Sequence, residues 1–301
     1  MKVGLGKHEL LLIASGILWG TSFVTIKIAL NNEVDPIFFA LLRFLVGTAA
    51  IMAVVFWMRR FDAKVLLYPP IIFNSFLNAL SFALQNVGME STSATNSVLL
   101  VNTNIGVVAI LAAIFLAEAI TPRIILGIAL GLVGVLFIST DGDLSAIYSG
   151  TFWGNLLVLA AGWVWAVYIV VQKKVLNRKT DVIMVTAAIM ANTTLFLVPM
   201  TLLFTTSYAL PATGWIAVVY IGLACTFGAN LLYNAGLKGV KASISSVILL
   251  MEVVSGMVFA MIILGEMPTA ITAMGGLLVL LSILIISLAT GGPIKRAKPS
   301  S

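Results

Sequence analysis

The sequence contains few charged residues. Asp, Glu, Lys and Arg make up only 9% of its 301 residues, whereas a soluble domain carries roughly 25%. Apolar residues make up 61% of the chain, and the mean hydropathy is +1.14. No compact soluble fold can hide that much apolar surface from water. The composition therefore predicts an all-α polytopic membrane protein whose surroundings are the lipid bilayer.

Metal ligands and thiols are also scarce, since His8 and Cys225 are the only histidine and cysteine. An intrachain disulfide is excluded. Zinc, haem and iron–sulfur sites need clusters of such ligands, so we expect no metal and no cofactor. An intramembrane enzyme would need metal ligands or a catalytic pair at depth. The sequence therefore argues against an enzyme.

Ten segments are apolar and long enough to cross a bilayer as helices, which takes about 20 residues each. They are 9–30, 36–57, 66–88, 92–116, 122–140, 150–172, 182–204, 211–236, 242–264 and 269–290.

Lys and Arg in the short loops predict the orientation. With the N-terminus in the cytoplasm, 15 of the 17 basic residues lie on the cytoplasmic side, and only Lys27 and Arg43 lie toward the other side. We predict that both termini are cytoplasmic and that residues 291–301 form a basic cytoplasmic tail. The net charge of +6 is thus a topology signal, and nucleic acid is not an expected partner.

The two halves of the chain repeat each other. Residues 84–89 align with 232–237 at an offset of 148, and Lys27 aligns with Lys173 at an offset of 146. We predict two repeats, 9–140 and 150–290, each with five spans. Because five is odd, the second repeat enters the membrane inverted. Inverted repeats place the substrate site between the halves near mid-bilayer and suit alternating access.

Polar and aromatic residues share helix faces within several spans, and a polar side chain there is costly unless it faces a cavity or a partner. In the third span Asn74, Asn78, Ser81 and Gln85 form one stripe. The full set of predicted cavity residues is Trp19, Ser22, Asn74, Asn78, Ser81, Gln85, Ser97, Asn104, Trp165, Tyr168, Asn230, Tyr233 and Glu252. The alternative is that the polar members only bond between helices.

Glu252 is the only acid deep within a span. It either contacts substrate or a proton, or it is a structural carboxyl bonded to backbone or to Ser and Thr. Lys27 and Arg43 are candidates for gating or ion pairing. Snorkelling, or pairing with Glu33 and Asp35, accounts for both. Alternatively, Arg43 meets a substrate carboxylate or closes an outer gate.

The fifth and tenth spans carry almost no polar atoms after their first turn. Gly127 and Gly131 form a small-residue contact motif in the fifth span. We expect these two spans to serve as scaffold or as the seam of a homodimer.

Several short motifs recur in order across the chain: Trp19-Gly20-Thr-Ser-Phe23, Asp35-Pro36 followed by Arg43-Phe44, Leu116-Ala-Glu118 and Leu264-Gly-Glu266. In these the chain resembles the drug/metabolite transporter superfamily, specifically EamA-type ten-helix exporters such as the YddG-like amino acid exporters. The resemblance covers essentially the whole chain. It implies a monomeric or dimeric exporter of the inner (cell) membrane, with a cavity between its halves.

One departure from the family pattern concerns the fourth and ninth spans. The family usually carries a proline 13 residues before each of two terminal glutamates, but Ile105 and Val253 stand there. The sequence therefore does not say whether these spans bend. Glu118 and Glu266 match the family glutamates, and we interpret both as caps or loop anchors.

Taken together, the sequence predicts a secondary transporter that exports small organic solutes, namely amino acids or similar amphipathic metabolites, by alternating access. The same superfamily also offers carriers of drugs or cations and of sugar or nucleotide conjugates. A passive channel fits the two-fold repeat poorly. No phosphate-binding ATPase motif occurs, so a gradient or the substrate itself must supply the energy. Substrate, direction, proton coupling and oligomeric state stay open.

Overall fold

Every element in the part of the chain that the structure describes is a helix. The structure is a computed structural model that describes residues 6–116, 121–143, 149–176, 180–240, 242, 245 and 248–290. Glu118 and the predicted basic tail lie outside these residues. The helices are α1 (Lys7–Asn31), α2 (Pro36–Trp57), α3 (Ala63–Leu66), α4 (Pro69–Ser91), α5 (Ala94–Val101), α6 (Asn104–Leu116), α7 (Pro122–Thr140), α8 (Gly150–Val175), α9 (Val182–Phe204), α10 (Ala212–Tyr220), the π-helix η2 (Ile221–Gly228), α11 (Ala229–Gly239), α13 (Leu250–Phe259), the π-helix η3 (Ala260–Leu264) and α14 (Ala270–Thr290).

Within the described residues, six helical segments are long and apolar enough to cross a membrane: Lys7–Asn31, Pro36–Trp57, Ala94–Phe115, Gly150–Val175, Val182–Phe204 and Ala212–Gly239. Three shorter apolar segments, Ile125–Ile138, Met251–Leu264 and Ala270–Ser282, accompany them. The helix α4, which carries the polar stripe, is not among these segments. The prediction of an all-helical, multi-pass membrane protein is confirmed at this level.

The expected fourth span is broken in the middle. α5 ends at Val101 and α6 begins at Asn104. Between them Asn102 Nδ2 donates to the Val98 carbonyl at 2.9 Å, and Thr103 Oγ1 donates to the Leu100 carbonyl at 2.7 Å. Side-chain bonds of this kind compete with the helical backbone pattern.

A similar turn at Leu249 precedes α13. Each break therefore lies two to four residues before Ile105 or Val253, the positions where the family pattern has proline. Both spans are thus interrupted close to these positions although neither carries a proline there.

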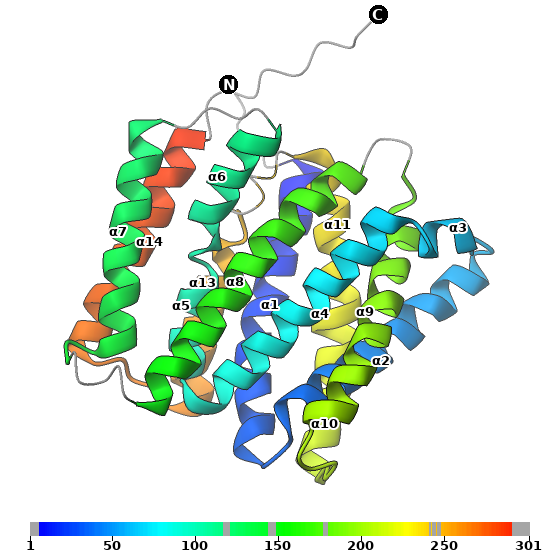
Figure 1. Cartoon of the computed structure of the whole chain (residues 1–301), viewed down its shortest axis with the longest axis horizontal. Coiled ribbons are helices and arrows are strands. Elements are labelled where there is room, and N and C mark those ends of the chain that lie inside the picture. Colours follow the sequence, from blue (N-terminus) through cyan, green and yellow to red (C-terminus); the bar gives the residue numbers. More distant parts are fainter. Residues whose placement is uncertain are drawn as a thin grey trace, which may run out of the picture.

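The helices form an elongated bundle (Figure 1). α7 and α14 lie side by side at one end, and α2 and α9 pack against each other at the other end. Between these pairs, α1 packs on α11 and α13, and α4 packs on α8. α1 begins and α14 ends at the same face, the upper one in Figure 1.

Close helix contacts depend on glycine. A Cβ at Gly88 of α4 would lie 2.6 Å from the Gly154 carbonyl of α8, and one at Gly134 of α7 would lie 2.6 Å from the Gly275 carbonyl of α14. A Cβ at Gly131 would lie 2.8 Å from Ser282 Oγ. The small residues of α7 therefore pack against α14 within the chain.

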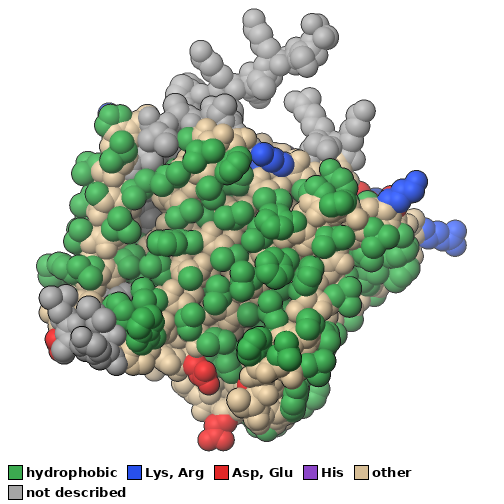
Figure 2. Space-filling model, in the orientation of Figure 1, with side chains coloured by type: hydrophobic (Ala, Val, Ile, Leu, Met, Phe, Trp, Pro, Cys, Tyr) green, Lys and Arg blue, Asp and Glu red, His purple; other side chains and the backbone are tan. Residues whose placement is uncertain are grey.

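The surface has the charge distribution of a membrane protein (Figure 2). Apolar side chains cover the broad face, Lys and Arg gather toward its upper edge, and acidic side chains gather at its lower edge. Large apolar residues are widely exposed, including Trp57 at 85% and Leu203 at 76%. An exposed apolar belt between charged rims is what lipid contact requires.

The Gly88 contact can be tested with a single methyl group. We expect Gly88→Ala to lower the stability of the detergent-solubilised protein by about 1–3 kcal/mol, because the new Cβ meets backbone that cannot move aside. Gly150→Ala is the matched control, since a Cβ there has nothing within 4 Å. Thermal unfolding measured by size-exclusion chromatography compares the two. Equal stability of both variants would show that the close approach is not needed.

Candidate functional site

A narrow cavity lies between α1, α4, α8, α13 and the break that joins α5 to α6. Its volume is about 30 Å³, which is room for about one water molecule and too little for an organic solute. Its walls are formed by Trp19, Ser22, Phe23, Ser81, Phe82, Gln85, Val101, Asn102, Asn104, Trp165, Leu249 and Glu252.

Seven of the thirteen predicted cavity residues line this space: Trp19, Ser22, Ser81, Gln85, Asn104, Trp165 and Glu252. The sequence analysis missed five others. Phe23 and Phe82 each follow a predicted residue on the same helix. Val101, Asn102 and Leu249 lie at the two helix breaks, which no pattern in the sequence predicted.

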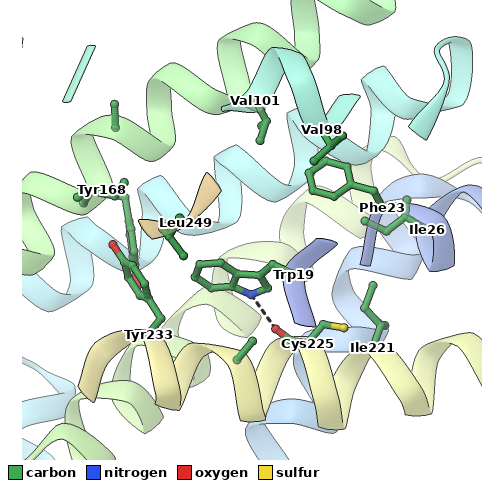
Figure 3. Packing of buried hydrophobic residues seen from close by; sticks show 14 of the residues in the cluster. Trp19, Phe23, Ile26, Val98, Val101, Tyr168, Ile221, Cys225, Tyr233 and Leu249 are labelled. Atoms are coloured by element: carbon green, nitrogen blue, oxygen red, sulfur yellow. Dashed lines mark hydrogen bonds between the residues drawn. The ribbon is translucent and has the colours of Figure 1, made fainter. Parts of the chain in front are cut away.

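One wall of the cavity is aromatic. The Trp19 and Trp165 rings meet edge to face with centroids 5.6 Å apart. The Tyr168 ring stacks on the Trp165 ring with centroids 4.2 Å apart, and the Tyr233 and Trp19 ring centroids are 5.0 Å apart. Both tyrosines are fully buried behind the tryptophans and do not line the cavity themselves. Trp19 Nε1 donates to the Cys225 carbonyl of η2 at 2.9 Å, which fixes the indole (Figure 3).

Glu252 lies in the first turn of α13, immediately after the helix break. The N-terminal end of a helix carries partial positive charge, which favours a nearby carboxylate. Among the described residues, however, its carboxyl has no hydrogen-bond or ion-pair partner. An ionised carboxylate removed from water without a partner costs several kcal/mol. The arrangement is therefore able to hold a proton or the ammonium group of a solute.

Two residues of the predicted stripe, Asn74 and Asn78, bond to neighbouring helices and do not line the cavity. Asn74 Nδ2 donates to Gln172 Oε1 at 2.8 Å, and Gln172 Nε2 donates to Asn234 Oδ1 at 2.9 Å. Asn78 Nδ2 donates to Thr193 Oγ1 at 3.0 Å. Ser81 takes part in both roles, since it lines the cavity and also donates to the Ala161 carbonyl at 2.9 Å.

Ser97 and Asn230 also lie outside the cavity lining. Each donates a hydrogen bond to the backbone carbonyl four residues earlier. Ser97 Oγ donates to the Ser93 carbonyl at 2.7 Å, and Asn230 Nδ2 donates to the Thr226 carbonyl at 2.7 Å. Both side chains are thereby satisfied locally.

Lys27 does not pair with Glu33 or Asp35. Its ammonium donates to the carbonyls of Met89 at 3.0 Å and Glu90 at 3.4 Å, at the C-terminal end of α4. Asp35 caps α2 by accepting from the N–H groups of residues 37 and 38, both at 3.0 Å. A cation at a helix C-terminus is a favourable arrangement.

Arg43 also lacks the acidic partner that was one expected explanation for it. Its side chain is fully buried in α2, and Nε donates to Thr226 Oγ1 of η2 at 2.9 Å. The guanidinium carbon lies 4.6 Å from the centroid of the Phe82 ring. Nη1 and Nη2 have no partner among the described residues.

Glu266 caps the N-terminus of α5, in agreement with its interpretation as a cap or loop anchor. Its carboxylate accepts from the N–H groups of Ala94 at 2.9 Å and Thr95 at 2.8 Å, and from Thr95 Oγ1 at 2.8 Å. It thus joins the loop after η3 to the start of α5.

Comparison with known proteins agrees with this architecture. The profile of the EamA-like transporter family matches residues 6–140 and 152–288. An uncharacterized transporter of Archaeoglobus fulgidus is 32% identical over 279 residues, which cover 90% of this chain and 94% of the relative. The uncharacterized transporter YwfM of Bacillus subtilis is 25% identical over 292 residues, 94% of each chain.

A protein of known crystal structure, 18% identical, matches with a TM-score of 0.72 over 95% of this chain and 99% of its own. At that identity the likeness concerns the fold alone. The family match over both halves carries more weight, and on it the chain belongs to the EamA-like transporter family, a family of membrane transporters.

Proposed function

We propose that this transporter is a secondary carrier in the inner (cell) membrane that moves small amphipathic solutes by alternating access. In this proposal the chain consists of two inverted five-helix repeats, both termini are cytoplasmic, and the substrate passes between the repeats. The observation that carries the proposal is a pair of equivalent lysine contacts, one in each half of the chain. Each lies one helical turn away from the central aromatic and polar residues.

The two lysines are repeat mates. Lys27 donates to the Met89 carbonyl at 3.0 Å, and Lys173 donates to the Leu237 carbonyl at 2.7 Å. Lys27 and Lys173 differ by 146 in number, and Met89 and Leu237 differ by 148, which are the two offsets of the internal repeat. We name these contacts the Lys27 latch and the Lys173 latch.

Other equivalent contacts support an inverted repeat. Asp35 caps α2, and Asp181, 146 residues later, caps α9 in the same way. Thr48 and Thr194, again 146 apart, bond to each other with their hydroxyl oxygens 2.9 Å apart. Contact between equivalent residues is what a two-fold axis produces where it passes between them.

The latches lie where a transport path would need gates. Phe23 and Gln85 line the cavity, and Lys27 and Met89 each follow one of them by four residues, so the bond crosses the gap between α1 and α4 one turn beyond the cavity. The Lys173 latch closes the corresponding gap between α8 and α11. In this proposal, both latches formed and a cavity of about 30 Å³ correspond to an occluded conformation, and one latch must open before a solute enters.

The free energy of each latch is small enough for a gate that must open and close. A cation at a helix C-terminus contributes about 0.3–1 kcal/mol, and up to about 2 kcal/mol when partly buried. Such a bond biases the conformation of one end and still opens readily. The proposed orientation puts the Lys27 latch on the outer side, because Lys and Arg gather at the opposite, upper edge in Figure 2.

The cavity walls favour an amphipathic amine. Trp19, Trp165 and Phe82 offer apolar surface, Gln85 and Asn104 offer hydrogen bonds, and Glu252 offers a carboxyl. Amino acids combine the matching groups, and we propose them as exported cargo. Lipophilic organic cations are the second candidate, because aromatic faces beside a carboxyl also suit a cation.

Counterflow in proteoliposomes tests the carrier function. Vesicles loaded with unlabelled amino acids are offered labelled leucine, phenylalanine or threonine, with and without a proton gradient. We expect accumulation that depends on internal substrate. If Glu252 carries the coupling proton, Glu252→Gln abolishes gradient-driven flux and leaves exchange intact.

Glu9→Gln, in the first turn of α1, is the matched control and is expected to change neither activity. Equal loss of flux and exchange in Glu252→Gln would argue against a proton-carrying role. Absence of counterflow for every amino acid, from protein shown to be folded, would exclude amino acids as cargo and direct the test to organic cations.

The latches predict opposite effects of two matched substitutions. In a Cys225→Ala background with Ser22→Cys as a reporter in the cavity, Lys27→Met should raise labelling by an impermeant thiol reagent from the outer side. Lys173→Met should raise labelling from the cytoplasmic side. The expected increase is about 3- to 30-fold, which corresponds to the loss of about 0.7–2 kcal/mol. Increases from the same side in both variants would contradict the gating roles.

A further inference from the structure

A buried guanidinium with unused hydrogen-bond donors lies beside the central cavity. Arg43 is fully buried in α2, in one of the segments apolar enough to cross the membrane. Its Nε is bonded to Thr226, but Nη1 and Nη2 have no partner among the described residues. A buried charge is costly unless it is paired and hydrogen-bonded.

The surroundings of Arg43 do not neutralise it. Its guanidinium carbon lies 4.6 Å from the Phe82 ring centroid and 5.8 Å from that of Phe44. Among the described residues, no acidic side chain forms an ion pair with Arg43 within 4 Å. The planar fork of free N–H groups matches the two oxygens of a carboxylate.

Phe82 links the surroundings of Arg43 to the cavity. Its ring contacts the Arg43 guanidinium and also lines the central cavity. There the Phe82 and Trp165 ring centroids are 6.0 Å apart. One aromatic side chain thus contacts both the Arg43 guanidinium and the space where we propose that the solute binds.

The internal repeat provides a comparison for Arg43. At the offset of 146, its equivalent is Ile189 of α9, which is buried and apolar. The same place in the second half therefore accepts an isoleucine, and the helix packing does not itself require a guanidinium.

Thr226, the partner of Arg43, provides a second comparison. It belongs to the π-helix η2, whereas its equivalent, Asn78, lies within the regular helix α4. π-Helical turns occur frequently at functional sites. The two halves therefore differ in side chain at Arg43 and in helix type at Thr226, and these two residues are hydrogen-bonded to each other.

We propose that Arg43 is the anion subsite of this transporter: it binds the carboxylate of a monocarboxylate solute, and Phe82 is the movable partition between subsite and cavity. The inference rests on the proposed function and narrows its substrate class. A solute with a carboxylate is accepted, and an otherwise identical neutral amide is not.

Binding to the purified full-length protein tests the subsite directly. The probes are phenylacetate with phenylacetamide and phenylalanine with phenylalaninamide, and the readout is tryptophan fluorescence, since Trp19 and Trp165 line the cavity. We expect each carboxylate to bind at least tenfold more tightly than its amide. Arg43→Gln should abolish this preference, and Arg43→Lys, which keeps the charge without the fork, should restore part of it. Arg60→Gln is the matched control and should leave the preference unchanged.

Equal affinities of acid and amide for the wild-type protein would overturn the proposal, even if Arg43→Gln does not fold. So would a preference that survives in Arg43→Gln, or failure of both carboxylates to bind. Counterflow separates the two levels. Intact counterflow without a carboxylate preference rejects the Arg43 subsite alone, whereas folded protein without counterflow for any solute rejects the carrier function.

Discussion

Polar groups inside a bilayer have no water to bond, so each must find a partner in the protein or in a ligand. Among the described residues, many buried polar side chains bond to one another within the bundle. Asn74, Gln172 and Asn234 form a continuous chain of hydrogen bonds across three helices. The Glu252 carboxyl and Nη1 and Nη2 of Arg43 are charged groups deep in the bundle that the described residues leave without a partner. A buried charge left unpaired is costly, so the proposed function assigns a solute or a proton to these two groups.

The internal repeat separates scaffold from chemistry. Features that recur at the repeat offsets, such as the capping residues Asp35 and Asp181, build equivalent helices in both halves. The two charged groups beside the cavity, Glu252 and Arg43, do not recur. Glu252 has Asn104 as its equivalent, and Arg43 has Ile189. A repeated frame thus surrounds an unsymmetrical centre, as the proposed carriage of a solute with two different ends requires.

The sequence predicted the features that helical periodicity encodes. The lengths of the apolar segments predicted the helices. The positions of Trp19, Ser81 and Gln85 on shared helix faces predicted that they line the cavity. Phase alone does not distinguish a residue that faces a cavity from one that bonds sideways. The partner of Asn74 is Gln172, 98 residues away, and only the packing of α4 on α8 brings them together. The partners of Lys27 are backbone carbonyls, which every residue possesses and which therefore leave no signal in the sequence. The break at Asn102 and Thr103 was missed because proline, the expected marker, is absent there.

The central claim is that the two ends of the transporter open in turn. Spin labels in a Cys225→Ala background, at Glu33 and Glu90 for the α1–α4 end and at Lys174 and Lys238 for the α8–α11 end, allow both separations to be measured by double electron–electron resonance. Each pair would be followed with and without saturating substrate and across a pH series. The account predicts that one distance lengthens as the other shortens. Distances that lengthen together would indicate a channel, and distances that never change would contradict alternating access.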